Sequence, residues 1–368
     1  MPLSSLNLSP RSIHLISAML NCSDDLFISF DIGAAGGAHD LWKPVSNMAR
    51  VIGFDANREE CERLNKLENN MRVFPFVLGE SVGPSKFYIT NYPLCYGLYP
   101  VNDAFLSRFP NYFNNKVIEE IDVETTTIDT FVAEQAIERI DFIKIDAEGA
   151  ELPILSGGKD ALTSRKVLGI ITELWWDPCI KGQPSFSELD IFLRDNGFYL
   201  FDLECTRYPR TTLPLGALNA IEEEVESEAG PQRRVTVSPS PLNVKYGQIL
   251  TGDALYLRDP IQDAAAKKGG DFWDKETILR YIGILDLLNY QDMAIEILDF
   301  FRDGALASVD VDSLIDSLVP PLCSRVIPFD EYWNMSDAFF KQLISPTHRP
   351  LVTMQAPRYV RPENRKKD

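Results

Sequence analysis

The amino-acid sequence predicts an α/β fold built around a largely parallel sheet. From residue 26 to about residue 167, apolar runs of strand length alternate with segments of helical periodicity, which is typical of βαβ units. The first apolar run ends in Asp31 and is followed by a glycine-rich turn, as in sheets that bind ligands at the carboxyl ends of their strands. The length of 368 residues also leaves room for a second unit.

Strands and helices are predicted in alternation through the first part of the chain. The regular strands are expected at residues 26–31, 51–55, 71–78, 141–146, 167–174, 198–203 and 248–257. The helices are expected at residues 13–20, 41–48, 58–69, 128–137, 152–162 and 186–196. The last of these helices is followed by Gly197, a residue that favours helix C-termini. Residues 86–90 and 120–127 are also rich in β-forming side chains.

Two segments interrupt this alternation. Residues 91–115 are rich in proline, asparagine and aromatic side chains, which predicts a long, partly ordered loop. Residues 216–241 form an insertion, and its acidic run at residues 221–228 predicts a solvated loop. A role for this acidic run in binding a metal or a partner is the less favoured interpretation.

A helical extension is predicted after Pro260. Amphipathic helices at residues 277–287 and 292–301 form one helical hairpin, and a third helix is expected at residues 311–318. The predicted parts are therefore an α/β domain at residues 1–260, the helical extension at 261–344 and a basic, extended tail at 345–368. The hairpin is a candidate homo-oligomer interface, and the tail either frays or packs on another subunit.

The charge balance limits the classes of partner. The formal net charge is −18 and the sequence pI is about 4.7, which disfavours broad binding to nucleic acid or to anionic lipid. No apolar run is long enough to cross a bilayer. The six cysteines are scattered without a C-x-x-C pair, which favours unpaired thiols in a reducing compartment. We therefore expect a cytoplasmic protein with no nucleic-acid partner and no membrane span.

The glycine turn after the first strand predicts a nucleoside-binding site. Gly33 and Gly37 follow Asp31 and place backbone N–H groups at the carboxyl edge of the sheet, while Asp55 at the tip of the next strand suits ribose hydroxyls. A dinucleotide site has a second glycine at the position of Ala35, where it makes room for the pyrophosphate. This difference favours a nucleoside-type cofactor over NAD.

Carboxylates follow two later strands at the same edge. Asp146 and Glu148 come directly after a buried strand, and Glu173 ends the next one. Like charges that crowd together are unfavourable unless they have a use, so these three side chains are candidate catalytic groups. Glu151 is explained by the start of a helix, where a negative charge is favourable. His39, just after the glycine turn, is either a capping side chain or a catalytic base.

The segment of residues 144–151, with the sequence KIDAEGAE, closely resembles the signature of the FkbM family of S-adenosylmethionine-dependent methyltransferases. The loop of residues 30–37, Asp55 and the TTTID sequence of residues 125–129 match that family in the same order. The resemblance spans roughly residues 29–260. It implies the class I methyltransferase fold, which is Rossmann-like with a mostly parallel seven-stranded sheet and flanking helices. It also implies O-methylation of a sugar, glycan or natural product.

The resemblance and the local sequence together assign roles to individual residues. The predicted cofactor-binding residues are Asp31, Gly33, Gly36, Gly37, Asp55, Leu78 and Asp146. The predicted catalytic residues are Asp146, Glu148, Glu173 and His39. The expected cofactor is S-adenosylmethionine, and the expected partner is a hydroxyl-bearing small molecule or carbohydrate.

Three alternatives accompany this prediction. Asp146, Glu148 and Glu173 are oxygen ligands of the kind that Mg²⁺ and Ca²⁺ prefer, although a site without metal is favoured. The chain could also be an NAD-dependent oxidoreductase, or a non-catalytic scaffold that keeps the methyltransferase fold. The sequence does not name the acceptor: the tyrosines at residues 92, 96 and 99 suit either a carbohydrate face or the core of a lid.

Overall fold

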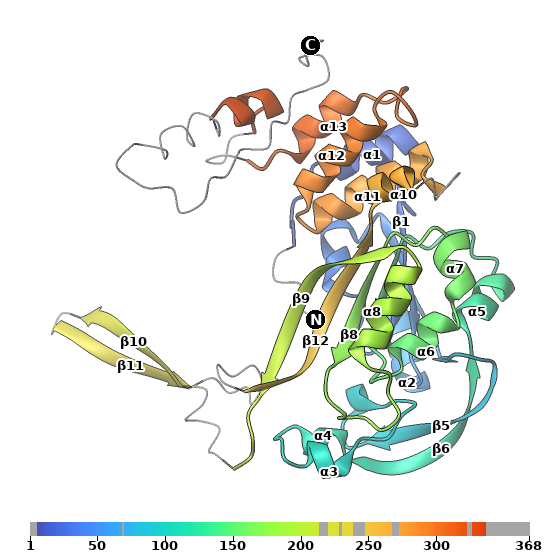
Figure 1. Ribbon diagram of the computed structural model, residues 1–368, viewed down its shortest axis with the longest axis vertical. Coiled ribbons are helices and arrows are strands. Elements are labelled where there is room, and N and C mark those ends of the chain that lie inside the picture. Colours follow the sequence, from blue (N-terminus) through green and yellow to red (C-terminus); the bar gives the residue numbers. More distant parts are fainter. Residues whose placement is uncertain are drawn as a thin grey trace. The chain divides into compact units, whose positions relative to one another are not determined.

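The computed structural model describes residues 6–67, 70–212, 220–227, 230–237, 247–266, 272–321 and 326–335. The described residues divide into two compact units, which are drawn in Figure 1. We call the described residues 24–259 the sheet unit, and the described residues 6–23 together with those from 260 onward the helical unit.

The centre of the sheet unit is a seven-stranded sheet with the order β3-β2-β1-β7-β8-β12-β9. Its strands are β1 (Phe27–Ile32), β2 (Ala49–Phe54), β3 (Met71–Phe74), β7 (Phe142–Ile145), β8 (Gly169–Trp175), β9 (Phe198–Tyr208) and β12 (Gln248–Arg258). Strands β1, β2, β3, β7 and β8 pair in parallel, whereas β12 is antiparallel to both β8 and β9. The predicted class I methyltransferase fold, with its mostly parallel sheet of seven strands, is confirmed.

Both faces of the sheet are covered, which explains why its central strands are apolar throughout. On one face, Ile28 and Phe30 belong to a core shared with the helices. The helices that contribute residues to that core are α5 (Ile128–Glu134), α6 (Glu151–Ser156), α7 (Lys159–Ser164) and α8 (Phe186–Asp195). On the other face, Phe27 packs against Trp42 of the 3-10 helix η1 (Asp40–Val45), with ring centroids 5.6 Å apart. Helix α2 (Arg58–Leu67) packs against β3.

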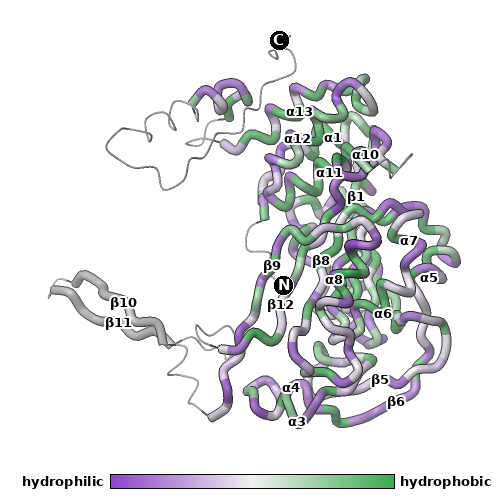
Figure 2. Tube along the Cα trace, viewed as in Figure 1, coloured by the Kyte–Doolittle hydropathy of each residue, from purple (hydrophilic) through white to green (hydrophobic). Residues whose placement is uncertain are grey.

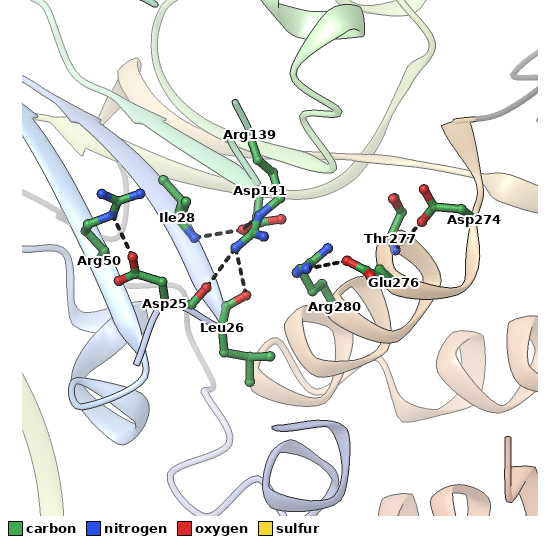
Figure 3. A network of polar contacts seen from close by, with 10 residues as sticks. All are labelled: Asp25, Leu26, Ile28, Arg50, Arg139, Asp141, Asp274, Glu276, Thr277 and Arg280. Atoms are coloured by element: carbon green, nitrogen blue, oxygen red, sulfur yellow. Dashed lines mark hydrogen bonds and ion pairs between the residues drawn. The ribbon is translucent and has the colours of Figure 1, made fainter. Parts of the chain in front are cut away.

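A polar network fixes the amino ends of β1 and β7. The buried carboxylate of Asp141 accepts hydrogen bonds from the backbone N–H of Ile28 at 2.7 Å and from Nε of Arg139 at 2.9 Å (Figure 3). Arg139 also donates to the carbonyl oxygens of Asp25 and Leu26. Since the backbone N–H of Asp141 donates to the carbonyl of Ile28, the two strands are locked in register at this end.

A second, smaller sheet lies in the same unit, with the order β4-β6-β5. Its strands are β4 (Val77–Leu78), β5 (Gly83–Thr90) and β6 (Val117–Thr126). Most of β6 is exposed, and Figure 2 shows its tube mostly in the hydrophilic colour, whereas hydrophobic residues gather around the central sheet. The strand predicted at residues 71–78 is divided into two strands, β3 and β4, which belong to different sheets. They are interrupted at Pro75, which has no N–H to donate to a sheet.

The segment of residues 91–115 is more ordered than predicted. It contains the 3-10 helix η2 (Pro93–Cys95) and the short helices α3 (Asp103–Leu106) and α4 (Tyr112–Asn115). Val101, Leu106 and Phe109 form a separate hydrophobic core with Trp175 and Ile180. The expected long connection is present, and it is more ordered than predicted because these apolar side chains find partners far away in the sequence.

Three further predictions were wrong in detail. The helix expected at residues 152–162 is divided into α6 and α7 at Gly157 and Gly158, where a β-carbon on Gly157 would lie 2.3 Å from the carbonyl oxygen of Gly79. The acidic run expected as a loop lies in an antiparallel hairpin of β10 (Ala220–Ser227) and β11 (Gly230–Val237), so the backbone of this insertion pairs with itself. The helix expected at residues 41–48 is the shorter η1.

The helical unit confirms the predicted helical C-terminal region. It comprises α1 (Ser12–Leu20), α10 (Pro260–Ala265), α11 (Lys275–Leu287), α12 (Gln291–Phe301) and α13 (Val311–Leu318), and α11 packs against both α1 and α12. Asp274 caps α11 by accepting from the N–H of Thr277, and Arg280 pairs with Glu276 on the same helix (Figure 3). Within the described ranges, no helix combines the length and the apolar character needed to span a membrane.

The division of the chain differs from the predicted boundary at residue 260, because residues 6–23 belong with the C-terminal helices. Asp286 of α11 is buried and explains this grouping. Its carboxylate accepts hydrogen bonds from Nδ2 of Asn7 at 2.8 Å, from Oγ of Ser12 at 2.6 Å and from Nε2 of Gln291 at 3.2 Å. The predicted basic tail at 345–368 lies outside the described residues.

We expect Asp286→Ala to destabilise the helical unit by about 3 kcal/mol, because it leaves several buried donors without an acceptor. Urea unfolding followed by circular dichroism measures this change. Asp303→Ala, at an exposed position of the same unit, should change stability by less than about 0.5 kcal/mol. Equal stability of the two variants would contradict the role assigned to Asp286.

Candidate active site

A cavity of about 550 Å³ opens at the carboxyl ends of β1, β2 and β7. This is the edge where open α/β sheets bind their ligands. All of the residues predicted to bind the cofactor lie in its wall: Asp31, Gly33, Gly36, Gly37, Asp55, Leu78 and Asp146. Of the residues predicted to be catalytic, Asp146, Glu148 and His39 also line the cavity.

The glycine turn lets two strands approach each other closely. Gly33 has φ +75°, and a β-carbon on it would lie only 1.9 Å from the carbonyl oxygen of Asp146. Gly36 has φ +93°, but the space where its β-carbon would stand is open. Gly33 is therefore required both by its backbone conformation and by the position of β7, whereas Gly36 is required by its conformation alone.

A buried ion pair stands behind this turn. Nζ of Lys144 lies 3.2 Å from Oδ1 of Asp31 and donates to the carbonyl oxygen of Gly33 at 2.8 Å. It also lies 4.0 Å from Oδ2 of Asp146. Burial raises the pKa of Asp31, although Lys144 opposes that shift. Burial disfavours the ammonium of Lys144, but the charges of Asp31 and Asp146 outweigh it and the pKa of Lys144 is raised.

Asp55 and an apolar wall occupy the part of the cavity next to β2. The carboxylate of Asp55 follows the last residue of that strand, accepts from the N–H of Asn57 at 2.8 Å and has its pKa raised by burial. Phe76 and Leu78 line the cavity as well. The ring of Phe76 is stacked on that of Phe74, with centroids 6.0 Å apart, so its orientation is fixed.

The three predicted carboxylates converge at the other end of the cavity. Asp146, Glu148 and Glu173 each have an oxygen within 4.8 Å of the others. Burial, together with the charge of Asp146, raises the pKa values of Glu148 and Glu173 well above the ordinary value. Glu173 does not line the cavity, and its Oε2 accepts a hydrogen bond from Nε1 of Trp175 at 2.9 Å. Crowding and burial therefore make the ionised forms of Glu148 and Glu173 less favourable than those of separate, exposed carboxylates.

Glu151 shapes the turn that carries Glu148. Its Oε1 accepts the N–H of Ala147 at 2.9 Å and the N–H of Gly149 at 3.2 Å. These bonds support a turn in which Glu148 has φ +51°, a conformation that non-glycine residues adopt rarely. Burial raises the pKa of Glu151 to about 7. The sequence suggested only a favourable charge at a helix start, whereas the side chain folds back onto the turn.

A further carboxylate lies behind Glu173. Asp253 of β12 is the register partner of Glu173 on β8 and of Glu204 on β9. Burial, with the charge of Asp146, raises the pKa of Asp253 to about 7. The sequence analysis missed this residue because the antiparallel return of β12, some eighty positions along the chain, is what brings it to the site.

His39 has a capping contact. Its Nδ1 accepts the N–H of Leu41 at 3.2 Å at the start of η1, and its own backbone N–H donates to Oδ2 of Asp31 at 3.0 Å. A neutral imidazole that accepts at Nδ1 carries its proton on Nε2. In this state the ring is a donor and not a base.

Residues 93–98, which we call the cover segment, form a further part of the cavity wall. Pro93, Leu94 and Tyr96 line the cavity, and a β-carbon on Gly97 would lie 3.1 Å from Cβ of Glu148. Of the three tyrosines singled out in the sequence, at residues 92, 96 and 99, only Tyr96 is in the described cavity wall. The cover segment therefore lies against the carboxylate end of the cavity.

Comparison with known proteins identifies the domain. Residues 31–200 match the family model described as the methyltransferase FkbM domain. The chain carries an FkbM methyltransferase domain. The match includes the glycine turn and every predicted site residue. No curated protein matches the chain's sequence.

Solved structures similar to this FkbM domain include several methyltransferases. Precorrin 8W decarboxylase from Methanobacterium thermoautotrophicum is 14% identical, covering 70% of this chain and 95% of that chain, with a TM-score of 0.28. Magnesium protoporphyrin IX methyltransferase from Synechocystis PCC 6803, with bound SAM, is 10% identical, covering 67% and 76%, with a TM-score of 0.29. Methyltransferase FkbM from Methylobacillus flagellatus KT is 15% identical, covering 42% and 33%, with a TM-score of 0.23. Because these scores are low, the fold assignment rests on the strand order.

One functional residue was missed although the sequence carried a signal for it. Lys144 is the single charged residue inside the otherwise apolar strand β7. Lysine is almost never fully buried unless it is paired, so its position in a buried strand indicates an internal carboxylate partner. That partner is Asp31 on the neighbouring strand β1.

We expect Gly33→Ala to destabilise the FkbM domain by at least about 3 kcal/mol, because the new methyl group overlaps a backbone oxygen. Gly36→Ala has only the strain of a positive φ and should lose about 1–2 kcal/mol. Urea unfolding of both variants measures the difference. A loss for Gly36→Ala as large as that for Gly33→Ala would contradict the close approach of β1 and β7.

The raised pKa of Asp253 predicts a pH dependence of stability. In the unfolded chain this carboxyl loses its proton near pH 4, whereas in the folded protein it does so near pH 7. The folded state therefore binds more protons between these values, and stability is lost as the pH rises. Asp253→Asn should gain about 4 kcal/mol relative to the unmodified protein between pH 4 and pH 8. The exposed control Asp195→Asn should show no such gain in stability. A stability difference between Asp253→Asn and the unmodified protein that does not change with pH would contradict the raised pKa of Asp253.

Proposed function

We propose that the FkbM domain transfers a methyl group from S-adenosylmethionine to a hydroxyl of a sugar, glycan or natural product. The observation that carries the proposal is the position of Asp146 and Glu148. They lie in the same cavity wall as Asp31, Gly33 and Asp55, so a base and a nucleoside site adjoin each other. A base next to the methyl donor is what a hydroxyl acceptor needs.

The charge of the cavity fits this cofactor. The described lining residues include five carboxylates, from Asp31, Asp40, Asp55, Asp146 and Glu148, and the ammonium of Lys144. S-adenosylmethionine carries a sulfonium and an ammonium against one carboxylate, so a negative cavity attracts it. The pyrophosphate of NAD would be repelled, and this disfavours the oxidoreductase alternative.

Individual residues have roles in this proposal. Asp55 would accept hydrogen bonds from the ribose hydroxyls, and Phe76 and Leu78 would border the adenine. Asp31 and Gly33 would lie beside the methionine end. The bound cofactor supplies an electrophilic methyl group on a sulfonium centre. The contribution of the protein is to align the acceptor oxygen with that methyl group and to exclude water from it.

The proton of the acceptor hydroxyl would pass to a carboxylate. Glu148 lines the cavity and has a raised pKa, so its ionised form is a stronger base than an ordinary carboxylate. Glu173 would stabilise the proton once it is bound, since its own carboxylate lies within reach. We assign the role of proton acceptor to Glu148 with Asp146 and not to His39, because Nδ1 of His39 already accepts the N–H of Leu41.

Two alternatives differ from this proposal in the role that they give to the carboxylates. The oxygens of Asp146, Glu148 and Glu173 are close enough to hold a hard divalent cation, which would orient vicinal hydroxyls of the acceptor. A scaffold that has lost catalysis would keep the fold but would not need the ionisable cluster. The cytoplasmic location and the assembly of copies through the helical unit stay predictions from the sequence.

Calorimetric titration with S-adenosylhomocysteine tests the cofactor site. We expect binding in the micromolar range, and Asp55→Ala should weaken it at least about tenfold by removing the acceptor for the ribose hydroxyls. The matched control Asp195→Ala, at an exposed end of α8, should bind like the unmodified protein. Absence of binding would favour the scaffold interpretation.

Transfer of a radiolabelled methyl group to a panel of sugars and glycans then tests the reaction. Glu148→Gln should reduce the transfer rate at least about hundredfold while the affinity for S-adenosylhomocysteine changes little. Transfer that persists after exhaustive chelation would exclude a required metal, and transfer restored only by Mg²⁺ or Ca²⁺ would establish one.

A further inference from the structure

Several backbone N–H groups around the cavity are already bound by acceptors of the protein itself. Gly36 N–H donates to Oε1 of Glu60 at 3.1 Å. His39 N–H donates to Asp31, and Leu41 N–H donates to the ring of His39. At the other end, the N–H groups of Ala147 and Gly149 share Oε1 of Glu151. Glycine turns and helix starts usually offer such N–H groups to phosphate, but here internal side chains occupy them.

The cationic side chain in the wall is committed in the same way. Among the described residues that line the cavity, Lys144 is the lysine, and there is no arginine. Its Nζ already contacts Oδ1 of Asp31 and the carbonyl oxygens of Gly33 and Ile32. An ammonium has three donors, so these contacts leave Lys144 little capacity for an external anion.

Carboxyl groups are concentrated where the acceptor would react. Asp146 and Glu148 line the cavity at this end, with Glu173 in contact and Asp253 on the next strand. The cover segment adds a wall of Pro93, Leu94 and Tyr96 without a charged side chain. An acceptor that enters this space meets carboxylates and apolar surface, and the ammonium of Lys144 in the wall is already paired with Asp31.

We propose that the site selects its acceptor by charge: it prefers hydroxyl compounds that carry a protonated amine, such as amino sugars, and rejects phosphorylated ones such as nucleotide sugars. This inference rests on the proposed O-methylation and narrows its substrate class. The ammonium of the acceptor binds the carboxylates and keeps its proton, so it has no lone pair and is not methylated. The neighbouring hydroxyl loses its proton to a carboxylate as its oxygen forms the bond to the methyl carbon and the bond from carbon to sulfur breaks.

A matched acceptor series tests the proposal. Glucosamine, glucose and glucose 6-phosphate, with kanamycin, maltotriose and UDP-glucose as larger counterparts, are incubated with radiolabelled S-adenosylmethionine. We expect kcat/KM to fall at least about tenfold from the amine-bearing to the phosphorylated member of each set, given one to two unit charges within about 8 Å. Equal or faster transfer to the phosphorylated members would overturn the proposal.

A binding measurement decides the charge rule even if none of these compounds is the acceptor. Adenosine and adenosine 5′-monophosphate compete with S-adenosylhomocysteine for the cavity, and they differ by one phosphate. We expect the monophosphate to bind at least about tenfold more weakly, and Glu148→Gln to reduce that ratio at least about threefold. Glu80→Gln, at an exposed position outside the cavity wall, should leave the ratio unchanged.

The two proposals fail in different ways. Methyl transfer to none of the sugars, together with the expected adenosine ratio, would contradict the sugar acceptor and support the selection by charge. Equal affinity for adenosine and its monophosphate would overturn the selection by charge, whatever the acceptor proves to be.

Discussion

The ion pair of Asp31 and Lys144 is the interaction on which the site depends. It joins the carboxyl ends of β1 and β7 across the centre of the sheet, where neither charge has much access to water. Removing one partner of such a pair leaves an uncompensated buried charge, which is far less favourable than losing a surface contact. The pair lies beside the close approach of Gly33 to Asp146, where the N–H of Asp146 also donates to the carbonyl oxygen of Ile32 at 3.0 Å. The nucleoside half and the carboxylate half of the cavity are therefore one assembly.

The carboxylates follow from this arrangement. Asp146 shares the ammonium of Lys144, so its charge is partly balanced, whereas Glu148 and Glu173 have burial and like charges around them. The carboxylates of one cavity thus have different surroundings: a cation lies beside Asp146, whereas burial and like charge raise the pKa values of Glu148 and Glu173. Acid and base chemistry needs such a difference between neighbouring groups. The sheet provides it because its neighbouring strands end at the same edge.

The cofactor half of the site could be predicted from the sequence, and the details of the carboxylate half could not. Asp31 and Asp55 follow apolar runs, so the strand pattern alone places them at the sheet edge. The position of Asp253 depends on long-range antiparallel pairing, and the fold-back of Glu151 depends on the conformation of one turn. The core beneath residues 91–115 escaped prediction for the same reason, since its partners lie on β8 and β12. Local sequence patterns predict the strands and helices, whereas contacts between residues far apart in the sequence decide which side chains meet.

The attachment of the cover segment has a consequence for how the acceptor preference can be altered. The residues that follow it are joined to the loop after β8: Val101 pairs with Ile180, and Asn102 donates to the carbonyls of Cys179 and Pro178. The glycine turn takes no part in these described contacts. Acceptor pockets could therefore be exchanged between relatives as one cassette of residues 91–115 with residues 177–183, transplanted onto an unchanged nucleoside site. A graft of the first segment alone would leave its hydrogen-bonding counterpart behind.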